Sequence, residues 1–198
     1  MMIYGFFYWL VRILMSLYFR IEVSGLEHVP KRGSVLILVN HITFLDPPMA
    51  AILMPRPVYF MAKAELFSVP VFGWLIRRLH AFPVHRGKAD RKAIRTSLQL
   101  LARDQALMIF PEGHRSHQGP LQEARAGAVY LAQKTGCPCL PIGISGQYGF
   151  RKTIRYSIGE LFTIPPEMER HDAQKMIMEK IAEQIEAPAH QESLPKKV

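Results

Sequence analysis

An unbroken apolar run over residues 34–39, S-V-L-I-L-V, leads directly into a polar turn, and this junction constrains the fold more than any other feature. The run is rich in β-branched residues and follows Gly33, so it predicts a buried strand. His41 then stands just beyond the carboxyl end of that strand. In an open α/β sheet this end is where reacting groups gather. The sequence therefore predicts an α/β fold with a site built on strand ends.

A carboxylate follows the histidine at close range, five positions along the chain. Pro47 suits the first helical position, which makes Asp46 the predicted N-cap of a helix running to about Leu53. In that geometry the carboxylate of Asp46 can hold the proton of one imidazole nitrogen of His41, while the other nitrogen faces outward as a base. The alternative is an ordinary loop histidine beside a capping aspartate. No H-x-x-x-H or C-x-x-C pattern accompanies the pair, so we expect no metal here.

Composition indicates one basic, globular domain. The 198 residues are 49% apolar and 21% charged, which suits a single hydrophobic core. The 25 lysines and arginines outnumber 16 aspartates and glutamates, and the formal net charge is +9. That surplus predicts an anionic partner, which can be nucleic acid, a phosphate-bearing substrate or a membrane. Cys137 and Cys139 flank a single proline, so we expect no disulfide between them.

Residues 2–19 are almost wholly apolar and predict a membrane-associating helix. At the usual rise such a helix would be about 27 Å long, slightly shorter than a bilayer core. Arg12 would lie near its middle, which favours a helix lying in the membrane interface over one that spans it. No basic leader or small-residue cleavage site predicts a removable signal. A helix that only covers the core is the alternative. The polar residues recur every four positions and form one stripe: Tyr4, Tyr8, Arg12, Ser16 and Arg20.

Three further predicted strands also end in charged residues. The strands cover residues 58–62, 82–84 and 106–110, and they are followed by Lys63, by Arg86, and by Glu112 and Arg115. Glu112 can accept hydrogen bonds from a polyol, and Arg115 can bind a phosphate through two parallel hydrogen bonds. Arg86 is the member of the surrounding basic cluster that we expect near a phosphate. The alternative for residues 110–116 is a plain turn closed by a salt bridge.

The last third of the chain predicts two further helices and one further buried strand of the α/β fold. A helix over residues 124–135 ends at Gly136, a buried strand follows over 139–144, and an amphipathic helix covers 172–186. Pro141 lies inside that strand, where a missing N–H suggests a sheet edge or a bulge.

Four stretches, in this order, resemble the glycerolipid acyltransferase family, specifically its 1-acylglycerol-3-phosphate acyltransferases. They are Asn40-His41-x4-Asp46-Pro47; Lys63-x-Glu65-Leu66 through Pro70, Gly73 and Arg86; Phe110-Pro111-Glu112-Gly113-His114-Arg115-Ser116; and Leu140-Pro141-Ile142-x-Ile144-x-Gly146. Together they cover most of residues 35–146. The third stretch departs from the family pattern, since it carries His114 where Thr or Ser is usual, and this bears on acceptor selectivity.

The resemblance implies acyl transfer from a thioester, acyl-CoA or acyl-carrier protein, to the free hydroxyl of a lysophosphatidate, which gives phosphatidic acid. No cofactor is implied. His41 would be the general base, and Asp46 would orient it and stabilise the imidazolium. The other roles implied are phosphate binding by Lys63, Arg86 and Arg115, binding of the glycerol portion by Glu112 with Gly113 beside it, and lining of the acyl path by Pro141 and Ile142.

The expected architecture is one α/β domain over residues 21–187, with a central, mostly parallel sheet flanked by helices. A membrane-associated helix over 1–20 precedes it, and a flexible tail over 188–198 follows it. We expect the protein to be peripheral or monotopic on the cytoplasmic face of the cell membrane.

Two alternatives remain open from the sequence. The first is a basic module that binds membrane or nucleic acid without chemistry, which explains the charge but not the polar residues at strand ends. We do not expect nucleic acid as a partner, because aromatic residues are not interleaved with the basic cluster. The second keeps the chemistry and changes the acceptor to glycerol 3-phosphate or another lysolipid.

Overall fold

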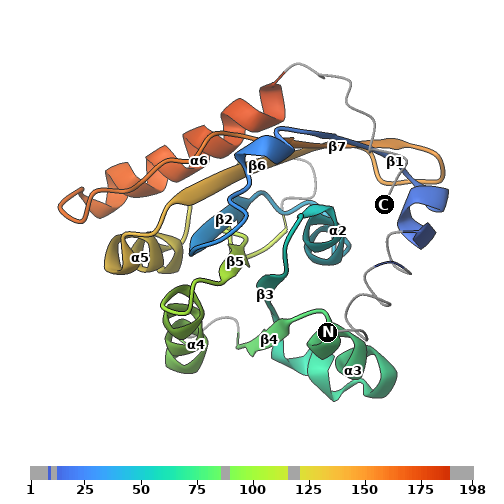
Figure 1. Ribbon diagram of the computed structural model, residues 1–198, viewed down its shortest axis with the longest axis horizontal. Helices are drawn as coiled ribbons and strands as arrows, with labels where there is room; N and C mark the ends of the chain where they lie inside the picture. Colours follow the sequence, from blue (N-terminus) through green and yellow to red (C-terminus); the bar gives the residue numbers. More distant parts are fainter. Residues whose placement is uncertain (1–8, 10–12, 86–89, 116–120, 188–198) are drawn as a thin grey trace.

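The computed structural model describes all of the chain except residues 1–8, 10–12, 86–89, 116–120 and 188–198. Its centre is a seven-stranded sheet in the order β1-β7-β6-β2-β5-β3-β4 (Figure 1). Neighbouring strands are parallel except β6 and β7, which are antiparallel. The prediction of a single α/β domain with a mostly parallel sheet is confirmed.

Strands and helices alternate along most of the chain, as the crossover connections of parallel strands require. The strands are β1 (Arg20–Ser24), β2 (Val35–Val39), β3 (Val58–Lys63), β4 (Ala81–Val84), β5 (Ala106–Ile109), β6 (Cys139–Gly146) and β7 (Thr153–Ile158). The helices are α2 (Asp46–Leu53), α3 (Pro70–Arg78), α4 (Arg91–Leu101), α5 (Ala126–Thr135) and α6 (Arg170–Glu186). Two short 3-10 segments, η1 (Leu26–His28) and η2 (Ala64–Ser68), follow β1 and β3.

β2 lies between β6 and β5 and is buried on both faces of the sheet. Each of its five residues is completely buried. Strands covered by helices on both faces carry continuous apolar runs, which explains the sequence of β2. Its side chains alternate between two cores: Ile37 and Val39 belong to the core beneath α2 and α3, whereas Leu36 and Leu38 face α4, α5 and α6.

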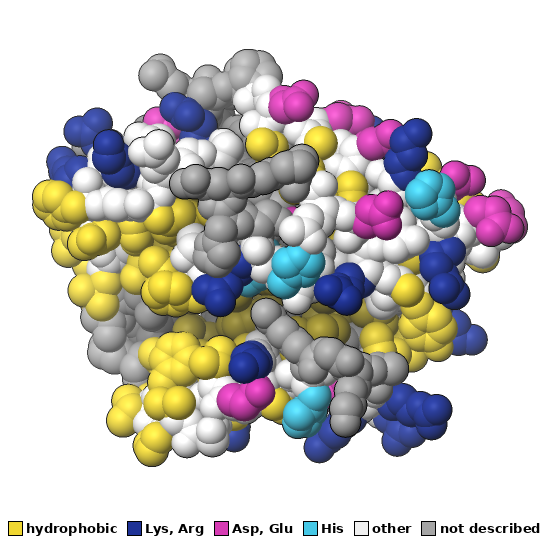
Figure 2. Space-filling model, turned by 180° about the vertical axis from the view of Figure 1, so that it is seen from behind, with side chains coloured by type: hydrophobic (Ala, Val, Ile, Leu, Met, Phe, Trp, Pro, Cys, Tyr) yellow, Lys and Arg dark blue, Asp and Glu magenta, His cyan; other side chains and the backbone are white. Residues whose placement is uncertain are grey.

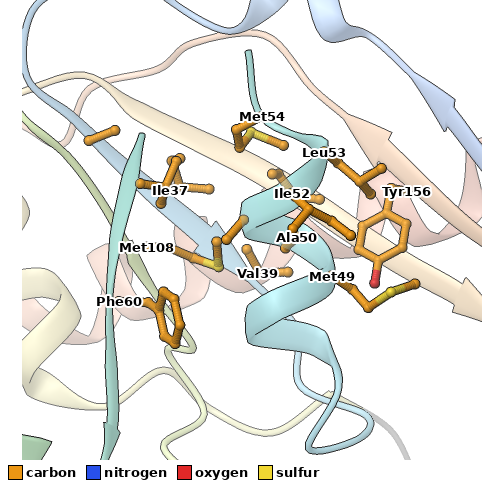
Figure 3. Packing of buried hydrophobic residues seen from close by; sticks show 14 of the residues in the cluster. Ile37, Val39, Met49, Ala50, Ile52, Leu53, Met54, Phe60, Met108 and Tyr156 are labelled. Atoms are coloured by element: carbon orange, nitrogen blue, oxygen red, sulfur yellow. The ribbon is translucent and has the colours of Figure 1, made fainter. Parts of the chain in front are cut away.

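α2 fills the first of these cores. Figure 3 shows the helix crossing the sheet face that carries Ile37 and Val39, with Met49, Ile52 and Leu53 among the side chains packed there. The whole stretch 49–53 is buried, as expected for a helix that is apolar on all sides. Because β2 and α2 are both held in the core, the turn that joins them is fixed at each end.

α6 packs against β6 at a glycine. A Cβ atom on Gly143 would lie 2.4 Å from the backbone carbon of Gln184, a distance that real side chains essentially never reach. The strand and the helix therefore meet backbone to backbone. Ile177 and Ile181 of α6 are completely buried in the second core, so they hold the helix in this place.

Pro141 lies in an inner strand, so the expectation of a sheet edge is wrong, whereas the alternative of a bulge agrees with the pairing. Cys139 pairs with Phe162 and Ile142 pairs with Ile158, so residues 140–141 lie opposite the three residues 159–161. β6 runs between β7 and β2, and its register with β2 is continuous. The pairing with β7 begins only at Ile142, and the carbonyl of Pro141 accepts the N–H of Gly159 at 2.9 Å. A residue's N–H and C=O point to the same side of a strand, so the N–H missing from proline would face this end of the ladder rather than β2.

At the N-terminus, residues 13–18 are helical, and the N–H of Phe19 donates to the carbonyl of Met15 at 2.8 Å. Arg20 opens β1 and so does not extend the helical stripe that the sequence predicted. Tyr4, Tyr8 and Arg12 of that stripe lie outside the described residues. Across the part of the chain that is described, no helix has the length and apolarity needed to cross a membrane.

Candidate active site

The turn after β2 brings a histidine and a carboxylate into contact. Nδ1 of His41 lies 2.8 Å from Oδ2 of Asp46. His41 is 4% exposed and Asp46 is completely buried, and the imidazole stacks on Phe110 with ring centroids 4.3 Å apart. The predicted pairing of these two residues agrees with this geometry. With Nδ1–H directed at Asp46, Nε2 is the imidazole atom left to act as a base.

The carboxylate of Asp46 does not cap α2, so that detail of the sequence prediction is wrong. Asp46 is itself the first residue of the helix, and the N-cap is Leu45. Its Oδ2 instead reaches back to accept the backbone N–H groups of Ile42 at 2.6 Å and Thr43 at 2.7 Å. The two residues that follow Asp46 are prolines, which offer no N–H to a capping side chain. The carboxylate therefore closes the turn beneath the imidazole.

A tyrosine completes the environment of Asp46. The hydroxyl of Tyr148 donates to Oδ1 at 2.5 Å and lies 3.1 Å from the hydroxyl of Tyr156. Burial, with Tyr156 and Asp46 as neighbours, raises the pKa of Tyr148, so its hydroxyl remains a proton donor. Asp46 thus receives hydrogen bonds on both oxygens and is held in one orientation relative to His41.

Asn40, the residue before the histidine, ties β2 to β6. Its side-chain Nδ2 donates to the carbonyl of Ile144 at 2.9 Å, and its Oδ1 accepts the N–H of the same residue at 2.6 Å. This two-way contact joins the first and the fourth family stretches. It fixes the backbone from which His41 projects.

Glu112, at the end of β5, is placed differently from its implied role. It is completely buried, and its Oε1 accepts the backbone N–H of His41 at 3.0 Å. Its Oε2 lies 3.5 Å from the backbone nitrogen of Gln122. These contacts hold the turn that carries His41 against the neighbouring strand end. The binding of a glycerol portion by Glu112 stays a prediction.

Gly113 and the residues after it form the surface of the same strand end. Gly113 has a φ of 73°, and a Cβ there would lie 2.6 Å from Nε of Arg125. That Nε donates to the carbonyl of Glu112 at 3.2 Å, so glycine is needed for the arginine to pack across the turn. His114 is partly buried, and Arg115 is exposed. The side chain of Arg115 is therefore accessible to an anion that arrives from solvent.

Lys63 ends β3, the strand next to β5. Its side chain is 52% exposed, and Nζ lies 3.3 Å from Oε1 of Glu65. The parallel pairing of β3 with β5, and of β5 with β2, brings the carboxyl ends that carry Lys63, Glu112 and His41 to one edge of the sheet. Arg86 lies outside the described residues, so its predicted place near a phosphate is untested.

The two residues assigned to the acyl path lie deeper. Pro141 and Ile142 pair with Leu38 and Val39 of β2, and both are buried in the sheet. They adjoin the strand that delivers His41. Their role in binding an acyl chain stays a prediction.

Tyr148, Arg125 and the side chain of Asn40 complete the site, and sequence reasoning gave none of them this role. Asn40 belongs to the first stretch, but the sequence did not predict its hydrogen bonds, because its partner Ile144 is 104 positions away. Tyr148 lies in the connection between β6 and β7 and has no motif of its own. Only the strand order brings such residues together.

Comparison with known proteins identifies the family to which this chain belongs. A model of the acyltransferase family matches residues 20–145. The chain belongs to the acyltransferase family. The 1-acyl-sn-glycerol-3-phosphate acyltransferase of Bacillus subtilis is 30% identical over 138 residues, which are 69% of this chain and 68% of that protein. The lyso-ornithine lipid O-acyltransferase of Pseudomonas aeruginosa is 32% identical over 139 residues, 70% of this chain and 52% of that protein. The resemblance drawn from four stretches is confirmed.

Among solved structures, the 1-acyl-sn-glycerophosphate acyltransferase PlsC from Thermotoga maritima superposes with a TM-score of 0.69. The match covers 90% of this chain and 78% of that one at 24% sequence identity, and it shows a shared fold. The chain spans 37–54% of the length of several other curated relatives. Their activities and substrates belong to those longer proteins.

Proposed function

We propose that the protein transfers an acyl group from a thioester to the free hydroxyl of 1-acylglycerol 3-phosphate, forming phosphatidic acid and a free thiol. The observation that carries the proposal is the buried contact of 2.8 Å between His41 and Asp46 at the carboxyl end of β2. The substrate supplies the attacking hydroxyl, so the reaction needs a base and no protein nucleophile.

The reaction begins with proton removal. Nε2 of His41 takes the proton of the acceptor hydroxyl as its oxygen attacks the thioester carbonyl. The imidazolium that forms is stabilised by the carboxylate of Asp46, which Tyr148 and the turn N–H groups hold in place. Positioned proton transfer of this kind typically contributes about 10²–10⁴-fold in rate.

The tetrahedral intermediate then collapses. The carbon–sulfur bond breaks, the imidazolium of His41 returns its proton to the departing thiolate, and the ester oxygen stays on the acceptor. The base is thereby regenerated, and no electron is exchanged with any other group. Every proton in the cycle passes through His41, so removal of this side chain should lower turnover by about 10²–10⁴-fold.

Binding of the acceptor is assigned to the exposed residues of the neighbouring strand ends. Lys63 and Arg115, with Arg86, would bind the phosphate, because a dianion gains most from arginine forks and lysine charges. Figure 2 shows a hollow across one face, with hydrophobic side chains in its floor and cationic side chains along its rim, as an amphiphile requires. Glu112 and Gly113 would adjoin the glycerol portion.

We place the protein as a peripheral or monotopic component of the cytoplasmic face of the cell membrane. The apolar residues 2–19 would lie in the interface, where a lysolipid is present. Acyl-CoA or acyl-carrier protein would deliver the thioester from the aqueous side. Nucleic acid is not proposed as a partner.

The test is a donor and acceptor panel. Purified protein is mixed with acyl-CoA or acyl-carrier protein thioesters and with lysolipids, while free thiol and product mass are measured. We expect phosphatidic acid from 1-acylglycerol 3-phosphate, formed about 10²–10⁴-fold more slowly by the His41→Ala variant. Thiol release that is independent of His41, or no acyl transfer to any acceptor, would falsify the proposal.

A second acceptor class has specific support, since a lyso-ornithine lipid acyltransferase is 32% identical to this chain. That relative's acceptor carries an amino acid headgroup, and His114 departs from the family pattern in the stretch that would face a headgroup. Preferential use of such a zwitterionic lysolipid over lysophosphatidate in the same panel would favour the second class. If the phosphate-free acceptor bound as tightly as lysophosphatidate, Lys63 and Arg115 would not be the phosphate-binding residues.

A further inference from the structure

Helix α3 turns its apolar side chains away from the core. Val71 is 80% exposed and Trp74 is 45% exposed, and Phe72 beside them is also exposed. Val69 and Leu66, just before the helix, add to this surface. Isolated exposed apolar residues are ordinary, but a contiguous group on one short element marks an interaction site.

The orientation of the helix is fixed by its inward face. Ile76 is buried in the first core. A Cβ on Gly73 would lie 2.5 Å from the carbonyl oxygen of Phe67, so α3 and η2 meet without space between their backbones. The helix cannot roll to bury Val71 and Trp74 without losing this contact. The exposed apolar face is therefore a built feature of the fold.

Cationic side chains border the apolar face. Arg77 and Arg78 occupy the last turn of α3, and the helix carries no acidic residue. The guanidinium of Arg78 lies 5.4 Å from the ring centroid of Trp74. Helices that bind at an anionic membrane interface typically expose a tryptophan and aliphatic side chains next to arginines. The exposed face of α3 has this composition.

We propose that α3, together with residues 66–69, is a second lipid-docking surface that inserts into the interface of an anionic bilayer. The inference goes beyond acyl transfer and does not depend on it. α3 and residues 13–18 lie on the same side of the molecule (Figure 1), and hydrophobic side chains gather down that side in Figure 2. Leu14 and Leu17 of the N-terminal segment are also exposed, so both surfaces can contact one leaflet. Lys63, one residue before η2, then faces the headgroup layer.

Trp74 itself supplies the decisive probe, because the chain has only two tryptophans. In a full-length Trp9→Phe variant, emission reports Trp74 alone. We expect a blue shift on adding phosphatidylglycerol and phosphatidylcholine vesicles, and quenching by lipids brominated near the headgroup end of the acyl chain. If the protein sediments with vesicles while Trp74 emission and quenching stay unchanged, α3 remains in water and the proposal is wrong.

Paired substitutions measure the contribution of the surface. Trp74→Ser with Val71→Ser should lower the vesicle partition coefficient about tenfold, since two partly buried apolar contacts are lost. Arg78→Gln should lower it about fivefold on anionic vesicles and little on neutral ones. The matched control is Tyr130→Ser, because Tyr130 is 47% exposed and belongs to α5, a helix that lies apart from α3 in Figure 1. This substitution should leave vesicle partition unchanged.

A second copy of the chain is the competing occupant. Light scattering of the wild type and of Trp74→Ser distinguishes the two cases. A wild-type dimer that dissociates on substitution, with vesicle partition unchanged, would overturn the lipid assignment. An equal loss of vesicle binding for Tyr130→Ser would overturn it too, because the effect would not be specific to α3.

Discussion

The turn after β2 and the segment after β3 begin at the same edge of the sheet and are built in opposite ways. In the first, polar groups point inward: Asp46 is completely buried and hydrogen bonded on both oxygens. In the second, apolar groups point outward, and Val71 is 80% exposed. A base must be held in one orientation away from water, whereas a surface that collects amphiphiles must stay open. Each strand end has the composition that the task proposed for it needs.

The strongest way to break this comparison is to remove the buried acid–base pair. His41→Ala and Asp46→Asn should each lower kcat by about 10²–10⁴-fold, because proton transfer is lost or the imidazolium loses its counter-charge. Thiol release measures turnover, and urea unfolding shows whether the variants fold. If both folded variants keep turnover within about tenfold of wild type, His41 is not the base.

Glu112 tests whether buried polar contacts or substrate contacts dominate at β5. Glu112→Ala removes the acceptor of the His41 N–H, and leaving that group unpaired should cost about 1–3 kcal/mol of unfolding free energy and lower kcat about 10-fold or more. Glu112→Gln keeps an acceptor oxygen and should lose much less. A change confined to the acceptor KM, with stability intact, would instead support the glycerol contact that the sequence implied.

The exposed cations should respond differently from the buried turn. Lys63→Ala and Arg115→Ala should each raise the KM of the acceptor about tenfold, because a charge-assisted hydrogen bond to phosphate is lost. The donor KM and the unfolding free energy should not change. Lys175→Ala is the matched control, since Lys175 is also an exposed lysine with a nearby glutamate. An equal loss for donor and acceptor would make Lys63 and Arg115 ordinary surface charges.

Tyr148→Phe sharpens the comparison within the buried region. It deletes one donor to Asp46 and keeps the ring, so kcat should fall about three- to tenfold with little change in KM. Tyr156→Phe should have a smaller effect, because its hydroxyl reaches Asp46 only through Tyr148. If the order of the two effects is reversed, the hydrogen bond from Tyr148 is not what orients the carboxylate.

The smallest effect is expected at His80, just after α3. Burial lowers the pKa of His80 below its ordinary value of 6.5, so the unfolded chain takes up a proton before the folded one. Stability is therefore full above pH 6.5 and falls as pH decreases through the folded pKa. His80→Asn should flatten this decline, and Asn tolerates the φ of 66° found there. Urea unfolding of the wild type and of His80→Asn at pH 7.5 and pH 5 measures this change in unfolding free energy.

Sequence patterns reached the strand ends but not the contacts among them. The spacing of His41 and Asp46 predicted their pairing, because five residues across a turn leave few geometries. The direction of the Asp46 carboxylate was missed, since it depends on which N–H groups the two prolines leave available. Glu112 and Tyr148 meet the same turn from 71 and 102 positions away. Such contacts follow from strand order, which no local pattern encodes.

Gly143 has a consequence for anyone who scans this protein by mutation. The backbone of α6 touches it, and the next residue, Ile144, exchanges two hydrogen bonds with Asn40, directly before His41. Any larger side chain at 143 would push either the helix or the strand, and the strand leads to the histidine. A mutational scan would then find position 143 as intolerant of substitution as a catalytic residue, although a side chain there would meet helix α6. Loss of activity there, taken without structure, would wrongly extend the map of the reaction centre to the C-terminal helix.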